Sequence, residues 1–278
     1  MYAGYWNLRE TPFLNTAESR YLFLGDQYEE AIARLVFLAE SGRQAGILTG
    51  PYGVGKSTVL QHVALAVVQK RIPVIRIDAI PGGQLPMARH ILARMKIEGA
   101  SSTLPEALMS FANAVESQQG NLARTLLCID EAHYLAAEEG LYLVHYLSNL
   151  RLFNKSSGKE EPLFTIVLAG IPELSTAVQS DPSLCQRVQI VFSLDPLSEA
   201  QTSAYIQEHM RTAGGDLWVF EKDALNALFR CSGGIPRKIN LLCDTALMLG
   251  FAAKANRIDE DLVHQAAHDI GLSTPHAQ

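Results

Sequence analysis

The chain has 278 residues, of which 48% are hydrophobic, and a formal net charge of −6. This length and composition fit a globular α/β domain with a smaller domain attached, and they argue against a disordered chain. The acidic balance gives no overall positive field of the kind that non-specific DNA-binding proteins use.

The sequence carries no sign of export or membrane insertion. No basic segment followed by an apolar one opens the chain, and no run approaches the roughly 18 apolar residues of a membrane span, so we expect a cytoplasmic protein without a direct membrane span. The four cysteines, at positions 128, 185, 231 and 243, show no paired spacing. We therefore expect buried, reduced thiols.

Residues 1–25 are aromatic and irregular in pattern, and we expect a linker that packs on the core. A helical pattern follows over 26–39. Short apolar segments then alternate with helical patterns. We expect strands at 45–50, 73–79, 125–131, 163–170 and 189–194, and helices at 56–69, 86–97, 104–119, 138–153 and 172–188. Because Val, Ile and Leu dominate the strands, this alternation predicts a parallel sheet with helices on both faces.

Strand patterns stop after residue 195. The chain continues with helical patterns at 198–213, 221–231, 236–254 and 259–270, which predict a small all-helical domain over 196–272 and a flexible tail over 273–278. Ser198 and Asp259 are expected to cap two of these helices.

A phosphate-binding motif connects the first strand to the helix after it. The motif GxxxxGK[ST] is matched by Gly50, Pro51, Tyr52, Gly53, Val54, Gly55, Lys56 and Ser57, with Thr58 directly following. Glycines let backbone N–H groups point at phosphates, and the helix N-terminus favours negative charge. We expect the Lys56 ammonium to bridge phosphate oxygens and the Ser57 hydroxyl to bind Mg²⁺.

Two adjacent carboxylates, Asp130 and Glu131, end the apolar strand at 125–131. Such a pair is costly at a buried strand end unless it binds something. We expect Asp130 to hold Mg²⁺ and Glu131 to deprotonate the attacking water. His133 completes the string Asp-Glu-Ala-His, but a helicase of that type needs a second sheet domain. We expect only a polar residue at the start of the next connection.

Two arginines are candidates for stabilising charge on a transferring phosphate. Arg187 precedes the last strand, at the edge of the sheet domain, and Arg237 begins a helix after a Gly-Gly-Ile-Pro turn. Sites of phosphoryl transfer often recruit such an arginine from a neighbouring subunit or a moving domain.

Taken together, these residues resemble an AAA+ ATPase, most closely the ExeA or GspA type of the general secretion pathway. The similarity spans nearly the whole chain. It rests on the segments YWNLRETPF, YLFLGDQYEEAIARL, GPYGVGKST, IDEAHYL, LSNLRLF, VLAGIPEL and SGGIPRKINLLCDTALMLG. The resemblance implies a P-loop α/β nucleotide-binding domain with a five-stranded parallel sheet over 26–195, followed by a helical lid.

The resemblance also implies roles and partners. Lys56 and Ser57 would be Walker A residues, Asp130 and Glu131 Walker B residues, Arg187 a finger acting in trans and Arg237 the sensor-2 arginine. ATP and Mg²⁺ would bind between copies of the chain, in a ring or spiral such as a hexamer or filament. Sensor 1, commonly polar, would fall near Ile171, so Asn149 or Thr165 is a candidate substitute.

Three functions remain open. The first is an oligomeric ATPase motor or switch that remodels a protein complex of the secretion type, with an unknown protein partner. The second is a DNA-binding transposition regulator like TniB, TnsC or MuB, which polymerises on DNA and recruits a transposase. Its candidate basic residues are Arg89, Arg94 and Lys96. The third is a nucleotide switch that binds ATP and barely hydrolyses it.

Overall fold

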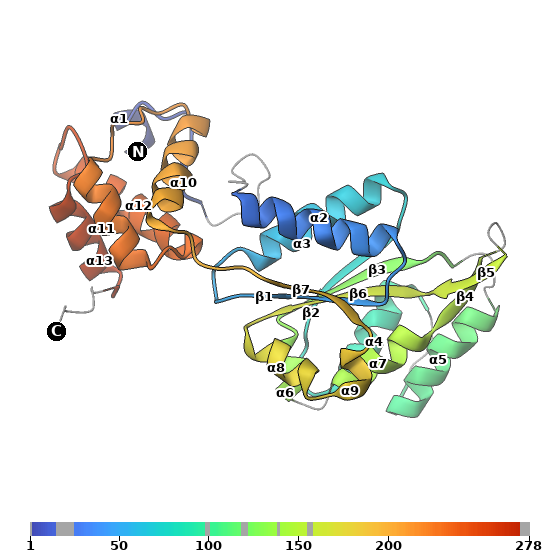
Figure 1. Ribbon diagram of the computed structural model, residues 1–278. Coiled ribbons are helices and arrows are strands. Elements are labelled where there is room, and N and C mark those ends of the chain that lie inside the picture. The colour runs from blue at the N-terminus through green and yellow to red at the C-terminus, as the bar shows by residue number, and fades with distance from the viewer. Residues whose placement is uncertain are drawn as a thin grey trace. The chain divides into compact units, whose positions relative to one another are not determined.

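The structure is a computed structural model that describes residues 2–14, 25–97, 101–117, 122–137, 140–154 and 158–272 (Figure 1). It divides into two compact units. The sheet unit comprises the described residues within 27–50 and 56–194, and the helical unit comprises those within 1–26, 51–55 and 195–278.

The sheet unit contains one five-stranded sheet in the order β2-β3-β6-β1-β7, and all its pairings are parallel. The strands are β1 (Ala45–Thr49), β2 (Val74–Asp78), β3 (Thr125–Asp130), β6 (Phe164–Gly170) and β7 (Val188–Ser193). Every residue of β1, β3 and β6 is buried, as a strand covered on both faces requires. The predicted five-stranded parallel sheet is confirmed.

Helices cover both faces of this sheet (Figure 1). One face carries α2 (Asp26–Glu40) and α3 (Lys56–Gln69), and the other carries α4 (Gln84–Arg94), α7 (Leu141–Asn149) and α8 (Glu173–Gln179). A further helix, α5 (Leu104–Ser117), packs against α4. The core between α4, α7 and the sheet is filled by buried aliphatic and aromatic side chains such as Ile91, Phe111 and Leu147.

Two expected helices are wrong in extent. The segment 138–153 does not form one helix: α6 (His133–Ala137) precedes α7, and β4 (Arg151–Asn154) then pairs antiparallel with β5 (Lys159–Pro162). The buried residues of α7 end at Ser148, whereas Leu152 is buried beside an exposed Phe153, which is the alternation of a strand. The segment 172–188 is split into α8 and α9 (Pro182–Cys185), because Pro182 cannot continue a helix and Asp181 caps the next one.

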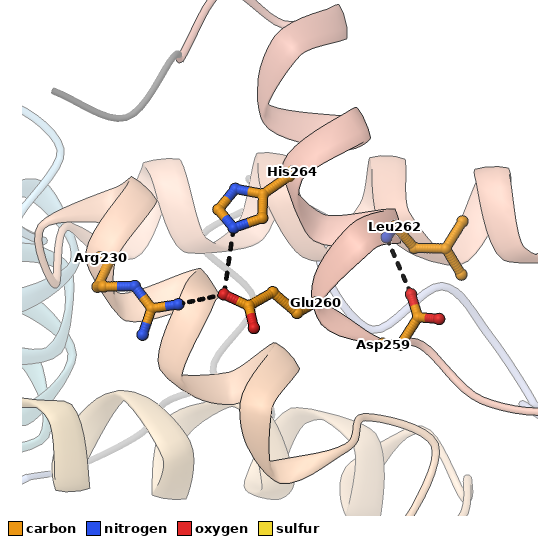
Figure 2. A network of polar contacts seen from close by, with 5 residues as sticks. All are labelled: Arg230, Asp259, Glu260, Leu262 and His264. Atoms are coloured by element: carbon orange, nitrogen blue, oxygen red, sulfur yellow. Dashed lines mark hydrogen bonds and ion pairs between the residues drawn. The ribbon is translucent and has the colours of Figure 1, made fainter. Parts of the chain in front are cut away.

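The helical unit contains α10 (Glu199–Thr212), α11 (Lys222–Ser232), α12 (Pro236–Ala252) and α13 (Glu260–Asp269). Both expected caps are present: the Ser198 hydroxyl accepts from Gln201 N, and the Asp259 carboxylate accepts from Leu262 N. Figure 2 shows that α13 is also joined to α11 through Glu260, whose Oε1 contacts Arg230 at 2.6 Å and His264 at 3.3 Å.

The N-terminal residues 2–14 are part of the helical unit, where α1 (Tyr2–Tyr5) packs on α12. Trp6 Nε1 donates to Leu247 O at 2.9 Å, and a Cβ at position 250 would lie 2.8 Å from the Trp6 ring, so Gly250 makes room for this packing. The expected linker thus contacts the C-terminal helices. The functional boundaries of the domains stay a prediction, and the tail 273–278 lies outside the described residues.

The cysteine expectation is correct at two positions. Cys128 and Cys243 are fully buried, and burial raises the pKa of Cys128 to about 12 and that of Cys243 well above its ordinary value. Cys185 is exposed, and Cys231 is partly so. Among the described residues, no helix combines the length and apolar character that crossing a bilayer would require.

Candidate functional site

The carboxyl ends of three neighbouring strands lie at one edge of the sheet. Thr49 of β1 is aligned with Gly170 of β6, and Ile129 of β3 is aligned with Leu168 of the same strand. Because β6 lies between β1 and β3, residues that follow these two strands start two strand spacings apart, about 10 Å. The strands that precede the phosphate-binding motif and the acidic pair therefore end at the same edge of the sheet.

The loop after β1 has the backbone conformation that its glycines permit. Gly50, Gly53 and Gly55 have φ angles of 153°, 79° and 107°, in a region that side chains with a Cβ rarely adopt. Lys56 then begins α3, is 5% exposed and donates from Nζ to Gly50 O at 2.8 Å. The Ser57 hydroxyl belongs to an exposed residue at the same helix start. A buried ammonium at a helix N-terminus suits an anionic ligand such as phosphate.

The two residues of the acidic pair differ in their backbone conformation and in their hydrogen bonds. Asp130 is 5% exposed and its Oδ1 accepts from Glu131 N at 2.9 Å. Glu131 has a φ of 51°, a left-handed conformation that is uncommon for a residue other than glycine and that often marks a functional site. Its Oε2 is buried and forms no hydrogen bond within the described part of the chain. A buried carboxylate oxygen without a hydrogen bond can accept one from a bound water or from a ligand of a bound metal.

Sequence reasoning gave no role in the site to two polar neighbours of this pair. His133 is 10% exposed, and its Nδ1 lies 3.4 Å from Glu131 Oε2; a Cβ at Gly170 would lie 3.3 Å from the same nitrogen. Asp78, the last residue of β2, is exposed and is aligned with Asp130. A sequence signal could have identified Asp78, because it is an acidic residue at the end of an apolar strand, as Asp130 is.

The two substitutes suggested for sensor 1 lie away from this edge. Thr165 is 1% exposed near the start of β6, and its hydroxyl donates to Arg43 O at 2.7 Å, so it is the wrong candidate. Asn149 ends α7 and contacts Arg187. Ile171 follows the last residue of β6 and is half-buried.

Arg187 lies at the opposite edge of the sheet from Lys56. It directly precedes β7, whose Val188 is aligned with Ala45, the first residue of β1. The five residues of β1 separate the two edges by about 16 Å, which exceeds the reach of an arginine side chain. Arg187 therefore cannot contact an anion bound at Lys56 of its own chain.

Arg237 lies in the helical unit, beside the tip of the motif loop. Its backbone N donates to Gly53 O at 3.2 Å, and a Cβ at Gly53 would lie 2.9 Å from Arg237 Cβ. The preceding turn is fixed by Gly234, where φ is 72° and a Cβ would lie 2.0 Å from Leu197 O. The residue is exposed, and its guanidinium makes no hydrogen bond or ion pair with the described residues.

The residues at the carboxyl edge fit a magnesium nucleotide. The motif loop and Lys56 offer donors for phosphate oxygens, and Ser57 and Asp130 offer oxygen atoms, the ligand type that Mg²⁺ prefers. Within the described residues, no cluster of three or more His, Cys, Asp or Glu side chains could hold a metal by itself.

Comparison with known proteins identifies the family. A model of the AAA domain matches residues 39–178, about half of the chain. General secretion pathway protein A of Aeromonas hydrophila is 31% identical over 277 residues, which cover 97% of this chain and 48% of that protein. The chain thus spans about half the length of that relative.

The fold is shared with solved structures of low sequence identity. Cdc6p from Pyrobaculum aerophilum has a TM-score of 0.71 at 15% identity, over 93% of this chain and 70% of that one. The ORC1 protein of Aeropyrum pernix, solved in complex with DNA, has a TM-score of 0.68 at 15% identity, over 95% of this chain and 69% of that one. These likenesses establish the AAA+ fold.

Proposed function

The chain belongs to the AAA+ family, and we propose that it binds magnesium ATP and hydrolyses it at interfaces between copies of itself. The observation that carries this proposal is the convergence of the buried Lys56 ammonium and the Asp130 and Glu131 carboxylates on one edge of the sheet. These groups supply a phosphate ligand, a metal ligand and a base.

The proposed roles follow from the chemistry of each group. Lys56 exchanges its bond to Gly50 O for phosphate oxygens, while the Ser57 and Asp130 oxygens hold Mg²⁺, which would neutralise phosphate charge. Glu131 orients a water and takes its proton, because its carboxylate follows β3 at this edge and its buried Oε2, 3.4 Å from His133 Nδ1, forms no hydrogen bond to the described residues. Arg237, whose backbone N donates to Gly53 O of the motif loop, is proposed as a further phosphate ligand. Each of these roles is a proposal for the residue named.

The separation of Arg187 from Lys56 supports assembly. A finger that stands about 16 Å from the phosphate site of its own chain can act only on ATP held by another chain. Pairing one edge of a subunit with the opposite edge of the next is a head-to-tail contact, and such contacts generate rings or helical filaments. We therefore propose a homo-oligomer of that kind.

Mixing two defective variants tests the action in trans. Arg187→Ala and Glu131→Gln proteins should each hydrolyse ATP slowly, with losses of up to about 10³ to 10⁵ for the arginine in the best cases. In an equimolar mixture that exchanges subunits, about a quarter of the interfaces combine both intact groups, so steady-state phosphate release should recover well above that of either variant.

The control for this mixture is the double variant Arg187→Ala/Glu131→Gln, which cannot rescue either partner. Light scattering in the presence of ATP checks that all proteins assemble. No recovery from a mixture shown to contain mixed assemblies contradicts the action of Arg187 in trans.

The secretion-type relative supports the first cellular role, an ATPase motor or switch that assembles or remodels a protein complex. In this role the protein partner engages a surface that changes with the bound nucleotide. The third possibility, a slow nucleotide switch, shares the site and differs only in turnover number.

DNA binding is the second candidate function, and the DNA complex of the ORC1 neighbour and an exposed basic segment favour it. Arg89, Arg94 and Lys96 are exposed at α4 and just beyond its end. Arg89 Nε donates to Ser101 O, whereas Arg94 and Lys96 make no ion pair with the described residues. Their charges are therefore open to phosphates.

Fluorescence anisotropy with labelled duplex DNA and ATP tests this candidate. Binding should weaken steeply between about 50 and 200 mM salt, and replacing Arg94 and Lys96 with alanine should lower the slope of log affinity against log salt by about 2. The matched control replaces Lys70 and Arg71, an exposed basic pair after α3. No ATP-dependent binding at low salt removes this function.

A further inference from the structure

Arg187 is held by uncharged acceptors. Its Nε and Nη2 donate to Oδ1 of Asn149 at 3.3 and 2.9 Å, and its Nη1 donates to the carbonyl oxygen of Ser183. Several other guanidinium groups of the chain pair with carboxylates instead. These are Arg34 with Glu30, Arg124 with Glu161, Arg211 with Glu208 and Arg230 with Glu260.

The difference matters for a guanidinium that must meet a phosphate. A carboxylate partner would fix the side chain but also offset its positive charge, and it would compete with phosphate for the same N–H groups. An amide oxygen accepts hydrogen bonds and fixes the guanidinium plane while the full charge remains. Asn149 therefore orients Arg187 without neutralising it.

The two contacts come from different helices. Asn149 is the last residue of α7, and Ser183 lies in α9, so Arg187 is held from two sides at the amino edge of the sheet. Asn149 and Ser183 are exposed and Arg187 itself is partly exposed, so the guanidinium can be reached by a ligand from outside the chain. Groups oriented before the ligand arrives contribute more to a transition state than mobile ones.

We propose that Asn149 is a positioning residue that holds Arg187 in place for the phosphates of ATP bound by a neighbouring copy of the chain. This inference rests on the proposed function, because it requires Arg187 to act in trans. Asn149 itself touches no nucleotide in this scheme. Its contribution is the orientation of a fully charged guanidinium.

The test compares Asn149→Ala and Asn149→Asp in the full chain, with Asn113→Asp as a control that adds the same charge on the exposed face of α5. At saturating ATP, turnover should fall about tenfold or more in Asn149→Ala because the guanidinium loses its orientation. It should fall similarly in Asn149→Asp, because the carboxylate holds Arg187 but offsets its charge. ATP affinity and assembly should stay at wild-type values, as should all properties of Asn113→Asp.

A merely structural role gives a different pattern, because an aspartate at position 149 would hold Arg187 at least as firmly and leave turnover unchanged. Subunit mixing gives a second readout. Asn149→Asp subunits keep Glu131, so blending them with Glu131→Gln subunits, which keep Asn149 and Arg187, should raise phosphate release above that of either protein alone. A misfolded site in Asn149→Asp subunits would show no such rescue.

Measuring the turnover of Arg187→Ala in parallel distinguishes a failure of the proposed role of Arg187 from a failure of the proposed role of Asn149. Wild-type turnover in Arg187→Ala contradicts the proposed role of Arg187 and, with it, this inference. Slow turnover in Arg187→Ala together with wild-type turnover in either Asn149 variant overturns the role of Asn149 alone.

Discussion

Replacing Lys56 with alanine should weaken binding of magnesium ATP by at least about a hundredfold, and saturation should disappear from an ordinary calorimetric titration. The Lys56 ammonium is buried at the start of α3 and already bonded to a backbone oxygen of the motif loop. Charge-assisted hydrogen bonds contribute about 1.5–3 kcal/mol each, and two such bonds to phosphate oxygens account for a loss of this size.

Lys70→Ala is the matched control for this prediction. Lys70 directly follows the same helix, and its Nζ contacts Glu40 Oε1 at 3.0 Å on the surface. Its removal should leave ATP affinity unchanged. Circular dichroism and thermal melting check that Lys56→Ala is folded. A folded Lys56→Ala protein that binds magnesium ATP with wild-type affinity contradicts the assignment of the phosphate site.

The sheet could be predicted from sequence because its central strands have a distinctive apolar pattern. Runs such as 126–129 and 163–170 are apolar at almost every position, as a strand covered on both faces requires. The motif loop could be predicted for a related reason, since its glycines occupy positions where φ is positive. In both cases one local physical constraint dominates the choice of residue.

The hairpin of β4 and β5 could not be predicted because no such constraint dominates there. The segment that begins at Arg151 continues a helical pattern from α7, and only the burial of Leu152 beside an exposed Phe153 distinguishes a strand. The pairing of Arg151 with Pro162 is a contact between segments that sequence periodicity does not encode. Tertiary pairing decided the structure of this segment.

Contacts between distant side chains escaped prediction for the same reason. Asn149 and Arg187 were both singled out, for separate roles, yet the bond between them depends on how α7 and α9 pack at the amino edge. The closeness of His133 to Glu131 depends in turn on the left-handed backbone at Glu131, which nothing in its side chain foretells. Residue type indicated the chemistry, whereas packing decided the partners.

Glu131→Gln should stop hydrolysis while ATP stays bound. The amide keeps the shape and hydrogen-bonding capacity of the side chain but cannot take a proton from water, and general-base catalysis contributes about 10² to 10⁴ in rate. Phosphate release at saturating ATP should fall by about that factor. The affinity measured by calorimetry should stay close to that of the wild type.

Glu173→Gln is the matched control, because Glu173 is an exposed carboxylate just beyond the carboxyl end of β6 and the change removes the same charge. Its turnover should match the wild type. Normal hydrolysis in Glu131→Gln contradicts the role of the base, and loss of ATP binding assigns Glu131 to nucleotide affinity instead. Retained binding with arrested turnover is the one combination that requires a proton acceptor at this position, because every purely structural defect in the loop or at Asp130 would lower affinity as well.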